Sequence, residues 1–274
     1  MSLSDSNGDG PRNWGTLRRP RADHEVVMLR ISEPPWGFWA TIGFSLIIYV
    51  AVMLLQIVAT VALLAAAQIH HPRPDFLAYV ARLDAQGLYL SLIICCINTP
   101  VFIALSAVVA SMRRDVPVKE YLGFCPVAVR KIVLWCGVLA LFIAGCDTIT
   151  FLAKGPVVPD FMIRAYKSAC FPPLLWFAFT VAAPVSEEVL FRGFLFQGIW
   201  RSRLGGVGAV LISSLAWAST HLQYNIYGIM WIFFSGLLLG TARIRTRSLY
   251  TPIAMHSLMN VVATAQVAIY LRMH

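Results

Sequence analysis

Long runs of apolar residues, separated by short polar connections, make up most of the chain after residue 37. A helix needs about 20 mainly apolar residues to cross a bilayer core of about 30 Å. The pattern predicts an all-α fold, a polytopic transmembrane bundle of about seven helices, at about 38–68, 88–112, 132–153, 173–200, 206–221, 226–242 and 250–271. An eighth element, interfacial or re-entrant, could lie around 156–171.

The first 35 residues differ from the rest because they are polar and carry Gly, Pro and Arg. We expect residues 1–35 to form a disordered tail and residues 36–274 to form one membrane domain, since no loop is long enough to fold separately. The first apolar run is about 30 residues long. This length predicts a retained span and not a cleaved signal peptide.

Composition agrees with a membrane protein. The chain is 58% hydrophobic and 13% charged, against about 25% charged residues in soluble domains, and its mean hydropathy is +0.71. A net charge of +9 would suit a nucleic-acid partner, but the basic residues are scattered through short loops, which is the pattern of membrane orientation. We therefore expect membrane lipids, and no nucleic acid, as partners.

The distribution of Lys and Arg predicts the orientation. Fifteen of the 22 lie in the N-terminal tail and the loops on its side, six lie on the opposite side, and Arg192 lies within a span. Because basic loops stay in the cytoplasm, the N-terminus is expected to be cytoplasmic. A compact chain without organelle signals favours a prokaryotic plasma membrane. The six cysteines include no CxxC pair and mostly lie in apolar runs, so we expect unpaired thiols.

Few ionisable residues fall within the predicted spans. Of thirteen acidic residues only Asp147, Glu187 and Glu188 do so, and of six histidines only His221 and His256 have apolar sequence on both sides. A charge at the bilayer centre costs at least about 2.5 kcal/mol. Such residues are therefore the first candidates for chemistry. Asp147 is the least specific of them and is expected to pair with a polar group of the bundle or to lie near the membrane interface.

The fourth span contains the run Glu187-Glu188-Val-Leu-Phe-Arg192. Glu188 and Arg192 are four residues apart, so they share a helix face and are expected to pair. Glu187 points about a quarter-turn away and is left for chemistry. The alternative is that all three residues form one neutralised cluster that only fixes helix packing.

Two later helices carry further polar groups. His221 follows Trp217 by one turn on the same face, and Asn260 follows His256 in the same way. His256 and Asn260 could donate to the same developing oxyanion, or they could only form interhelical hydrogen bonds.

Together these residues have the composition of a water-activating hydrolase. Glu187 would take a proton from water with the assistance of His221, and His256 with Asn260 would stabilise the tetrahedral intermediate. No GxSxG motif is present. A zinc site with Glu187, His221 and His256 as ligands, completed by water, uses the same residues. Spacing alone does not separate these two readings.

The order EExxxR, then aromatic-xxx-His, then His-xxx-Asn resembles the CPBP family, the CAAX-protease and bacteriocin-processing intramembrane proteases, also called the ABI family. The resemblance covers residues 173–265, which form the motif-bearing core. It implies that Glu187 activates water with His221, that His256 and Asn260 form the oxyanion hole, and that Glu188 and Arg192 shape the site. Trp217 stands where the family usually has Phe, a conservative aromatic change.

The resemblance also implies a function. The family includes the Ras-converting endoprotease, which removes the last three residues after a prenylated CAAX cysteine and resembles a protease that uses glutamate chemistry without a metal. We expect an intramembrane endopeptidase without a cofactor, acting on membrane-associated or lipid-modified, CAAX-like peptides. The alternatives are a non-catalytic scaffold or bacteriocin-immunity protein, and a transporter with a glutamate proton relay. The transporter predicts internal repeats, and none is visible.

The predicted depths of Glu187 and His221 in the membrane do not agree. Glu187 lies toward the cytoplasmic end of its span, whereas His221 falls near the far end of the fifth span in a seven-helix bundle. The two are level only if the fifth span is short, broken or re-entrant.

Overall fold

The structure is a computed structural model that describes residues 36–70, 86–113 and 116–274. The tail predicted at residues 1–35 lies outside this part of the chain. All regular elements of the described residues are helical, and none is a strand. The predicted all-α class is therefore confirmed. Residues Pro34–His274 form one compact unit.

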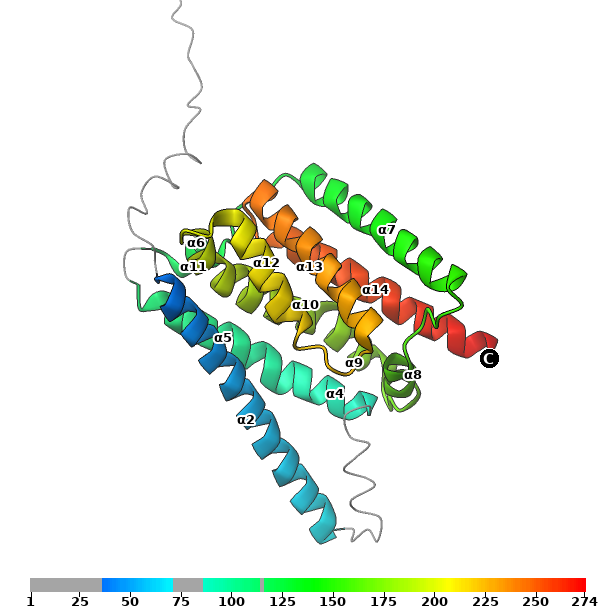
Figure 1. The fold of residues 1–274 in the computed structure, drawn as a ribbon. Coiled ribbons are helices and arrows are strands. Elements are labelled where there is room, and N and C mark those ends of the chain that lie inside the picture. Colours follow the sequence, from blue (N-terminus) through cyan, green and yellow to red (C-terminus); the bar gives the residue numbers. More distant parts are fainter. Residues whose placement is uncertain (1–35, 71–85, 114–115) are drawn as a thin grey trace, which may run out of the picture. The chain divides into compact units, whose positions relative to one another are not determined.

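The helices follow the predicted apolar runs closely (Figure 1). The fourth predicted helix is a composite of five consecutive α- and π-helical segments. In chain order the elements are α2 (Phe38–His70), α4 (Gly87–Ile93), η2 (Ile94–Asn98), α5 (Thr99–Ser111), α6 (Val118–Leu122), α7 (Val129–Leu152), α8 (Asp160–Lys167), α9 (Pro172–Phe177), η3 (Ala178–Ala182), α10 (Ala183–Glu188), η4 (Val189–Leu195), α11 (Phe196–Trp200), α12 (Gly205–Ala218), α13 (Ile226–Thr246) and α14 (Tyr250–Met273).

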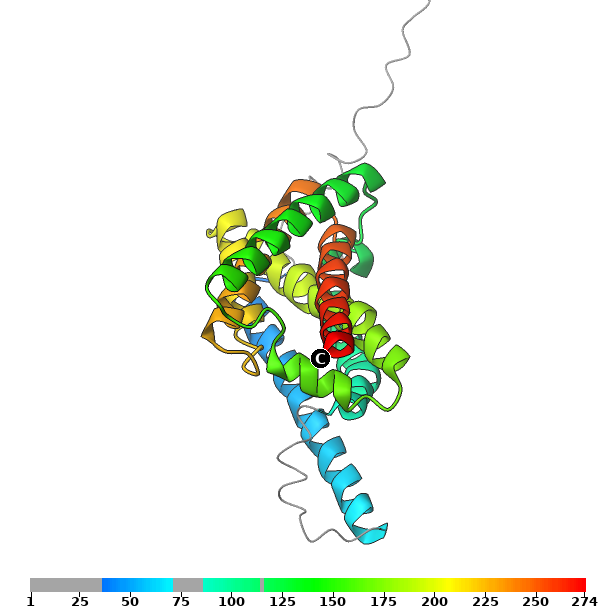
Figure 2. The same ribbon diagram turned by 90° about the vertical axis from the view of Figure 1, so that its right-hand side faces the viewer.

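Six helices of the described residues are long and apolar enough to cross a membrane. The fifth predicted span, at about 206–221, is α12, which has 14 residues and a length of about 21 Å at about 1.5 Å per residue. It is too short to cross a bilayer core of about 30 Å. The element suspected around 156–171 contains α8, which lies beside the C-terminal part of α14 (Figure 2). The polytopic bundle is thus confirmed, with six long helices and one short one.

The composite helix Pro172–Trp200 lies at the centre of the bundle. In its most apolar stretch 61% of the residues are buried, against 11% for α2 and 6% for α7. Figure 1 shows α2 and α7 on opposite sides of this helix, where α2 packs on α5 and α7 packs on α14. The outward faces of α2 and α7 are apolar and exposed, as a lipid-facing surface requires; they include Leu46, Ile47, Leu54, Val58, Val133, Leu134, Leu141 and Phe151.

Two of the π-helical segments are explained by prolines. Both η2 and η3 end two residues before a proline, Pro100 and Pro184. A proline has no N–H and clashes with the preceding turn of an α-helix, and widening that turn by one residue relieves the clash. The Ala183 N–H is accordingly bonded to Ala178 O, five residues back. The two widened regions also touch, because Thr99 Oγ1 donates to Ala182 O at 3.0 Å.

Small residues bring α12 and α13 close together. Gly236 faces Ser214 and Gly240 faces Val210, so that a Cβ added at Gly236 would lie 2.9 Å from Ser214 Cβ. The GxxxG pattern of Gly236 and Gly240 therefore marks a close helix contact, as small residues do in membranes. Gly205 has a φ of +58° and starts α12, which fits a turn and not a nucleotide-binding loop.

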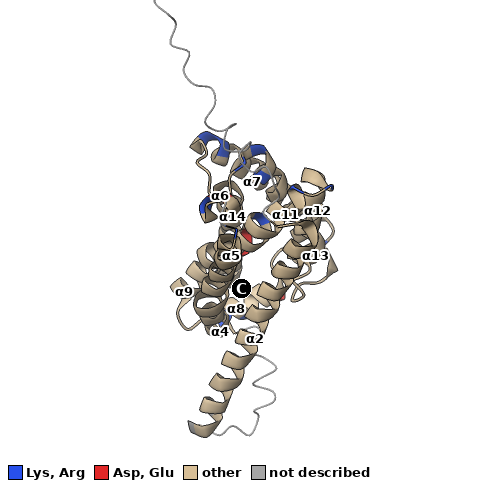
Figure 3. Ribbon diagram, turned by 90° about the vertical axis from the view of Figure 1, so that its left-hand side faces the viewer, with Lys and Arg blue, Asp and Glu red and all other residues tan. Residues whose placement is uncertain are grey.

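Lys and Arg gather mostly at one end of the described helices, where α7 begins and α11 ends (Figure 3). This end includes Arg130 and Lys131 at the start of α7 and Arg245 and Arg247 at the end of α13. The helices therefore separate the basic residues in the way that an orientation signal requires. Which side of the membrane this end faces is still a prediction.

We predict that Gly236→Ala destabilises the protein. Its Cβ would lie 2.9 Å from Ser214 Cβ and 3.1 Å from Arg192 Nη2, and overpacking of this kind costs about 1–3 kcal/mol. Gly240→Ala should cost less, because its nearest neighbour is at 3.3 Å. Gly137→Ala is the control, since nothing lies within 4 Å. Thermal unfolding in detergent measures all three, and equal midpoints for Gly236→Ala and Gly137→Ala would contradict the close contact.

Candidate active site

A buried ion pair lies at the centre of the site. Arg192 Nη1 donates to Glu188 Oε1 at 2.9 Å, and both side chains are fully buried. His256 Nδ1, from α14, lies 3.0 Å from the same carboxylate oxygen and donates to it. The predicted pairing of Glu188 with Arg192 is therefore confirmed, and the histidine of a distant helix joins it. This set gives Glu188 Oε1 a counter-charge and a second donor within an apolar interior.

Glu187 has a different environment from its neighbour. Its side chain is 24% exposed, whereas that of Glu188 is fully buried. Trp217 Nε1 donates to Glu187 Oε2 at 2.6 Å, and His256 Nε2 lies 4.0 Å from the same oxygen. Glu187 thus bonds to Trp217, whereas its neighbour Glu188 bonds to Arg192. Glu187 is the carboxylate that water or a substrate can reach.

Trp217 contacts four of the other site residues, Glu187, Arg192, His221 and His256. Its ring lies 4.5 Å below the guanidinium carbon of Arg192, and its centroid is 5.2 Å from that of His221 and 5.0 Å from that of His256. A cation over an indole face is favourable, the more so when it is desolvated. Sequence reasoning treated Trp217 as a conservative aromatic change and missed its hydrogen bond to Glu187. The signal was available, because an indole N–H in an apolar helix needs an acceptor.

His221 lies in the turn after α12, outside the six long helices. Its Nδ1 is 2.9 Å from Trp217 O and 3.2 Å from Thr220 Oγ1, which favours a proton on Nδ1 and leaves Nε2 as an acceptor. Burial lowers the pKa of His221, although the Glu187 carboxylate opposes this shift. The imidazole is therefore neutral at pH 7. His221 and Glu187 are not hydrogen-bonded; both contact Trp217.

Asn260 lies one turn from His256, and each side chain forms an interhelical hydrogen bond, one of the two roles expected for the pair. Asn260 Nδ2 donates to Phe179 O at 2.7 Å, and His256 contacts Glu188. The reason for the Asn260 bond lies in the π-helical turn. The Ala183 N–H is bonded to Ala178 O and the next residue, Pro184, has no N–H, so Phe179 O lacks a backbone donor. Asn260 supplies one.

Because α12 is short, Glu187 and His221 lie at similar depths. Glu187 is thirteen residues before Trp200, the end of α11, and Trp217 is twelve residues after Gly205, the start of α12. At about 1.5 Å per residue, these distances are about 20 Å and about 18 Å. The end of α12, with Trp217 and His221, therefore reaches the level of Glu187. A full-length span would have carried His221 past it.

The predicted zinc ligands are not gathered as a ligand set. Across residues 36–70, 86–113 and 116–274, no group of three or more His, Cys, Asp or Glu side chains is placed to hold a metal ion. Glu187 and His256 approach each other only to 4.0 Å, and His221 Nδ1 faces Trp217 O. The residues as arranged do not fit zinc. The six cysteines are free thiols, and each of them is partly or fully exposed.

Asp147 has a structural partner. Gln266 Nε2 of α14 donates to Asp147 Oδ2 of α7 at 2.6 Å. The expected pairing with a polar group of the bundle is confirmed, and the contact ties α7 to α14.

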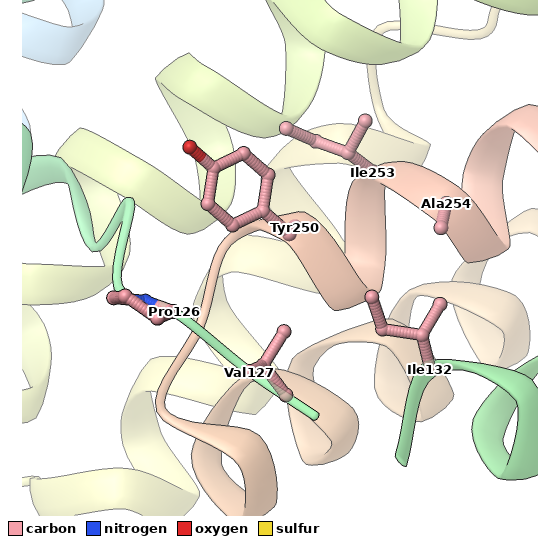
Figure 4. A pocket seen from close by; sticks show the side chains of 6 residues that line it. All are labelled: Pro126, Val127, Ile132, Tyr250, Ile253 and Ala254. Atoms are coloured by element: carbon pink, nitrogen blue, oxygen red, sulfur yellow. The ribbon is translucent and has the colours of Figure 1, made fainter. Parts of the chain in front are cut away.

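A pocket of about 500 Å³ lies elsewhere (Figure 4). It is apolar and is formed between the α6–α7 connection and the first turns of α7 and α14. None of the candidate catalytic residues lines it; its lining is Pro126, Val127, Ile132, Tyr250, Ile253 and Ala254. The candidate active site is therefore located by its polar side chains and not by this pocket.

We predict that Glu188→Gln destabilises the folded protein by about 3–5 kcal/mol, because it leaves the buried Arg192 cation without its counter-charge. Glu120→Gln is the matched control, since Glu120 is exposed on α6, and it should change the stability by less than about 0.5 kcal/mol. Thermal unfolding in detergent compares the two variants. If Glu188→Gln unfolded at the same temperature as Glu120→Gln, the ion pair would not hold the bundle together.

Comparison with known proteins gives a family for this region. Residues 169–262 match the family described as type II CAAX prenyl endopeptidase Rce1-like. The matched segment runs from the start of the composite helix to α14, and it contains Glu187, His221, His256 and Asn260. The resemblance inferred from the three motifs is thereby confirmed for about a third of the chain.

One curated relative is an "Uncharacterized 24.3 kDa protein" of Escherichia coli, which is 32% identical over 128 residues. The alignment covers 44% of this chain and 57% of the relative, so the chain spans little more than half of the relative's length. No solved structure matches the chain.

Proposed function

We propose, from the Rce1-like segment at residues 169–262, that the protein is an intramembrane endopeptidase that uses Glu187 to activate water. The observation that carries this proposal is the contrast between two adjacent carboxylates. Glu188 is fully buried and neutralised by Arg192, whereas Glu187 is 24% exposed and held by a single indole N–H. A carboxylate with this access can accept a proton from water at the site.

The remaining groups support a hydrolytic sequence. Glu187 removes a proton from water, whose oxygen attacks the peptide carbonyl carbon and forms a tetrahedral intermediate. When the C–N bond breaks, the proton on Glu187 passes to the leaving amine, and the carboxylate is restored. The neutral His221 has an acceptor nitrogen for orienting the water. Each step moves one proton between named groups, and none requires a cofactor.

His256 and Asn260 are assigned to the oxyanion. Glu188 fixes the orientation of the His256 ring through Nδ1, and Nε2 then lies on the side of Glu187, 4.0 Å from its carboxylate. Donation from Nε2 to the oxyanion requires the imidazolium form, with a proton on each ring nitrogen. The Asn260 amide has two N–H donors; Phe179 O accepts from its nitrogen, which leaves one for the oxyanion. Donors held in place before the reaction stabilise developing charge most effectively.

The substrate class follows from the site's surroundings and from the family. The site lies among helices whose outer faces are apolar, which supports a peptide that reaches it from the membrane. We therefore propose a membrane-associated or lipid-modified peptide of CAAX type as substrate. We also propose that the N-terminus is cytoplasmic in a prokaryotic plasma membrane, which the basic end of the bundle supports (Figure 3).

We predict that Glu187→Gln lowers the cleavage rate by at least about 100-fold, the usual contribution of a general base, without unfolding the protein. The probe is a farnesylated CAAX peptide with a fluorophore and a quencher on either side of the bond after cysteine. The same peptide without the farnesyl group tests whether prenylation is needed. Glu120→Gln serves as the activity control.

Cleavage at the normal rate by Glu187→Gln would end the glutamate mechanism. Absence of cleavage of both peptides by the unmodified protein, with binding retained, would support the scaffold or immunity alternative instead.

A chelator distinguishes the glutamate mechanism from a zinc mechanism that would use the same residues. We expect cleavage to persist after dialysis against EDTA, because Glu187, His221 and His256 are not arranged as zinc ligands. The measurement is the cleavage rate before and after dialysis, with the zinc content of the protein determined in parallel. Loss of activity that zinc restores would assign the three residues to a metal site.

A further inference from the structure

Arg243 is a second buried arginine, and the proposed chemistry does not use it. Its side chain lies in the last turn of α13, and the residue is 3% exposed. Within the described part of the chain no carboxylate pairs with it. Its partners are Arg192 O, to which its Nε donates at 3.3 Å, and the Trp200 ring, whose centroid is 6.0 Å from its guanidinium carbon. A buried cation without a counter-charge is costly, so its position needs a reason.

The first partner of Arg243 is a carbonyl that the π-helical turn leaves without its α-helical donor. The Phe196 N–H is bonded to Phe191 O, five residues back, instead of to Arg192 O. Arg243 Nε donates to Arg192 O in its place. Asn260 does the same for Phe179 O in η3. Both widened turns of the composite helix are therefore held by a side chain from a later helix. Single π-helical turns are frequent at functional sites.

The other side of Arg243 is fitted to Gly123. Gly123 ends α6 with a φ of +84°, and a Cβ at this position would overlap the Arg243 guanidinium. Gly123 O in turn accepts from Leu249 N at 2.7 Å, one residue before α14 begins. The guanidinium therefore lies between the turn that carries Arg192 and the connection that starts the helix of His256.

We propose that Arg243 is a positioning residue for the protease site, an inference that rests on the proposed function. By holding Arg192 O and fitting against Gly123, it fixes η4 relative to the start of α14. These two elements carry Arg192 and His256, which meet on Glu188. Arg243 touches neither substrate nor the reacting atoms. It keeps the buried ion pair and the imidazole in register.

The proposal explains why the residue is an arginine. The contact to Arg192 O is made by Nε, which has a fixed direction in the planar guanidinium, while the terminal nitrogens lie toward Gly123. A lysine has one flexible ammonium and cannot occupy both places. Arg243→Lys should therefore restore only part of the function that Arg243→Met loses.

The test compares Arg243→Met with Arg245→Met, which removes an exposed arginine two residues away on the same helix. Steady-state cleavage of the farnesylated peptide gives kcat and KM, and hydrogen exchange with mass spectrometry reports each segment. We expect Arg243→Met to lower kcat about 10- to 100-fold with little change in KM, since misplacing catalytic groups by about 1 Å costs up to about 100-fold. Exchange should rise in residues 189–197 and 249–256, and Arg245→Met should behave as the unmodified protein.

Gly123→Ala disturbs the contact between Gly123 and the Arg243 guanidinium without changing Arg243 itself. The added Cβ would displace the guanidinium, and the φ of +84° strains an alanine there as well. Gly123→Ala should therefore lower kcat at least as far as Arg243→Met, and the double variant should be no worse than Gly123→Ala alone. Additive effects of the two changes would overturn the proposal. So would unchanged kcat and exchange in Arg243→Met, or a uniform rise of exchange in all helices.

Failure of the positioning role of Arg243 and failure of the proposed function are distinguishable. Normal cleavage by Glu187→Gln overturns the glutamate mechanism, while the local exchange pattern still tests Arg243. Normal kcat in Arg243→Met, with Glu187→Gln inactive, overturns the positioning role alone.

Discussion

The buried pair of Glu188 and Arg192 is the interaction on which the rest of the site depends. A carboxylate and a guanidinium in an apolar bundle are tolerated only if each satisfies the other. Each neighbouring element contributes to this arrangement: Trp217 of α12 covers the guanidinium face, Gly236 of α13 leaves it room, and His256 of α14 binds the carboxylate. The charge pair thereby brings three later helices to one point on the composite helix.

The same interaction separates the roles of two adjacent glutamates. Because Arg192 and His256 are engaged with Glu188, Glu187 has only the Trp217 N–H as its close partner and keeps part of its surface exposed. Two identical side chains on one turn therefore differ in access and in hydrogen bonding. We attribute the proposed chemistry to this difference, since one carboxylate builds the site and the other is left to act in it.

Much of this arrangement was predictable from the chain, because it depends on periodicity. Apolar runs gave the helices, and four-residue spacing gave the Glu188–Arg192 pair. The parts that were missed depend on backbone register and on partners from other helices. The π-helical turn before Pro184 redirects Asn260 to Phe179 O, and no spacing rule shows which carbonyl a widened turn leaves without a donor. The sequence indicates that the Trp217 N–H needs an acceptor, but it does not show that this acceptor is Glu187.

In the proposed mechanism Glu187 activates water and does not itself bond to the substrate. A single turnover in H₂¹⁸O, followed by mass spectrometry of both product and protein, tests this directly. We predict one ¹⁸O atom in the new carboxyl terminus of the cleaved peptide and none in the protein segment that contains Glu187. Label in the Glu187 carboxylate would show a covalent acyl intermediate and contradict the claim.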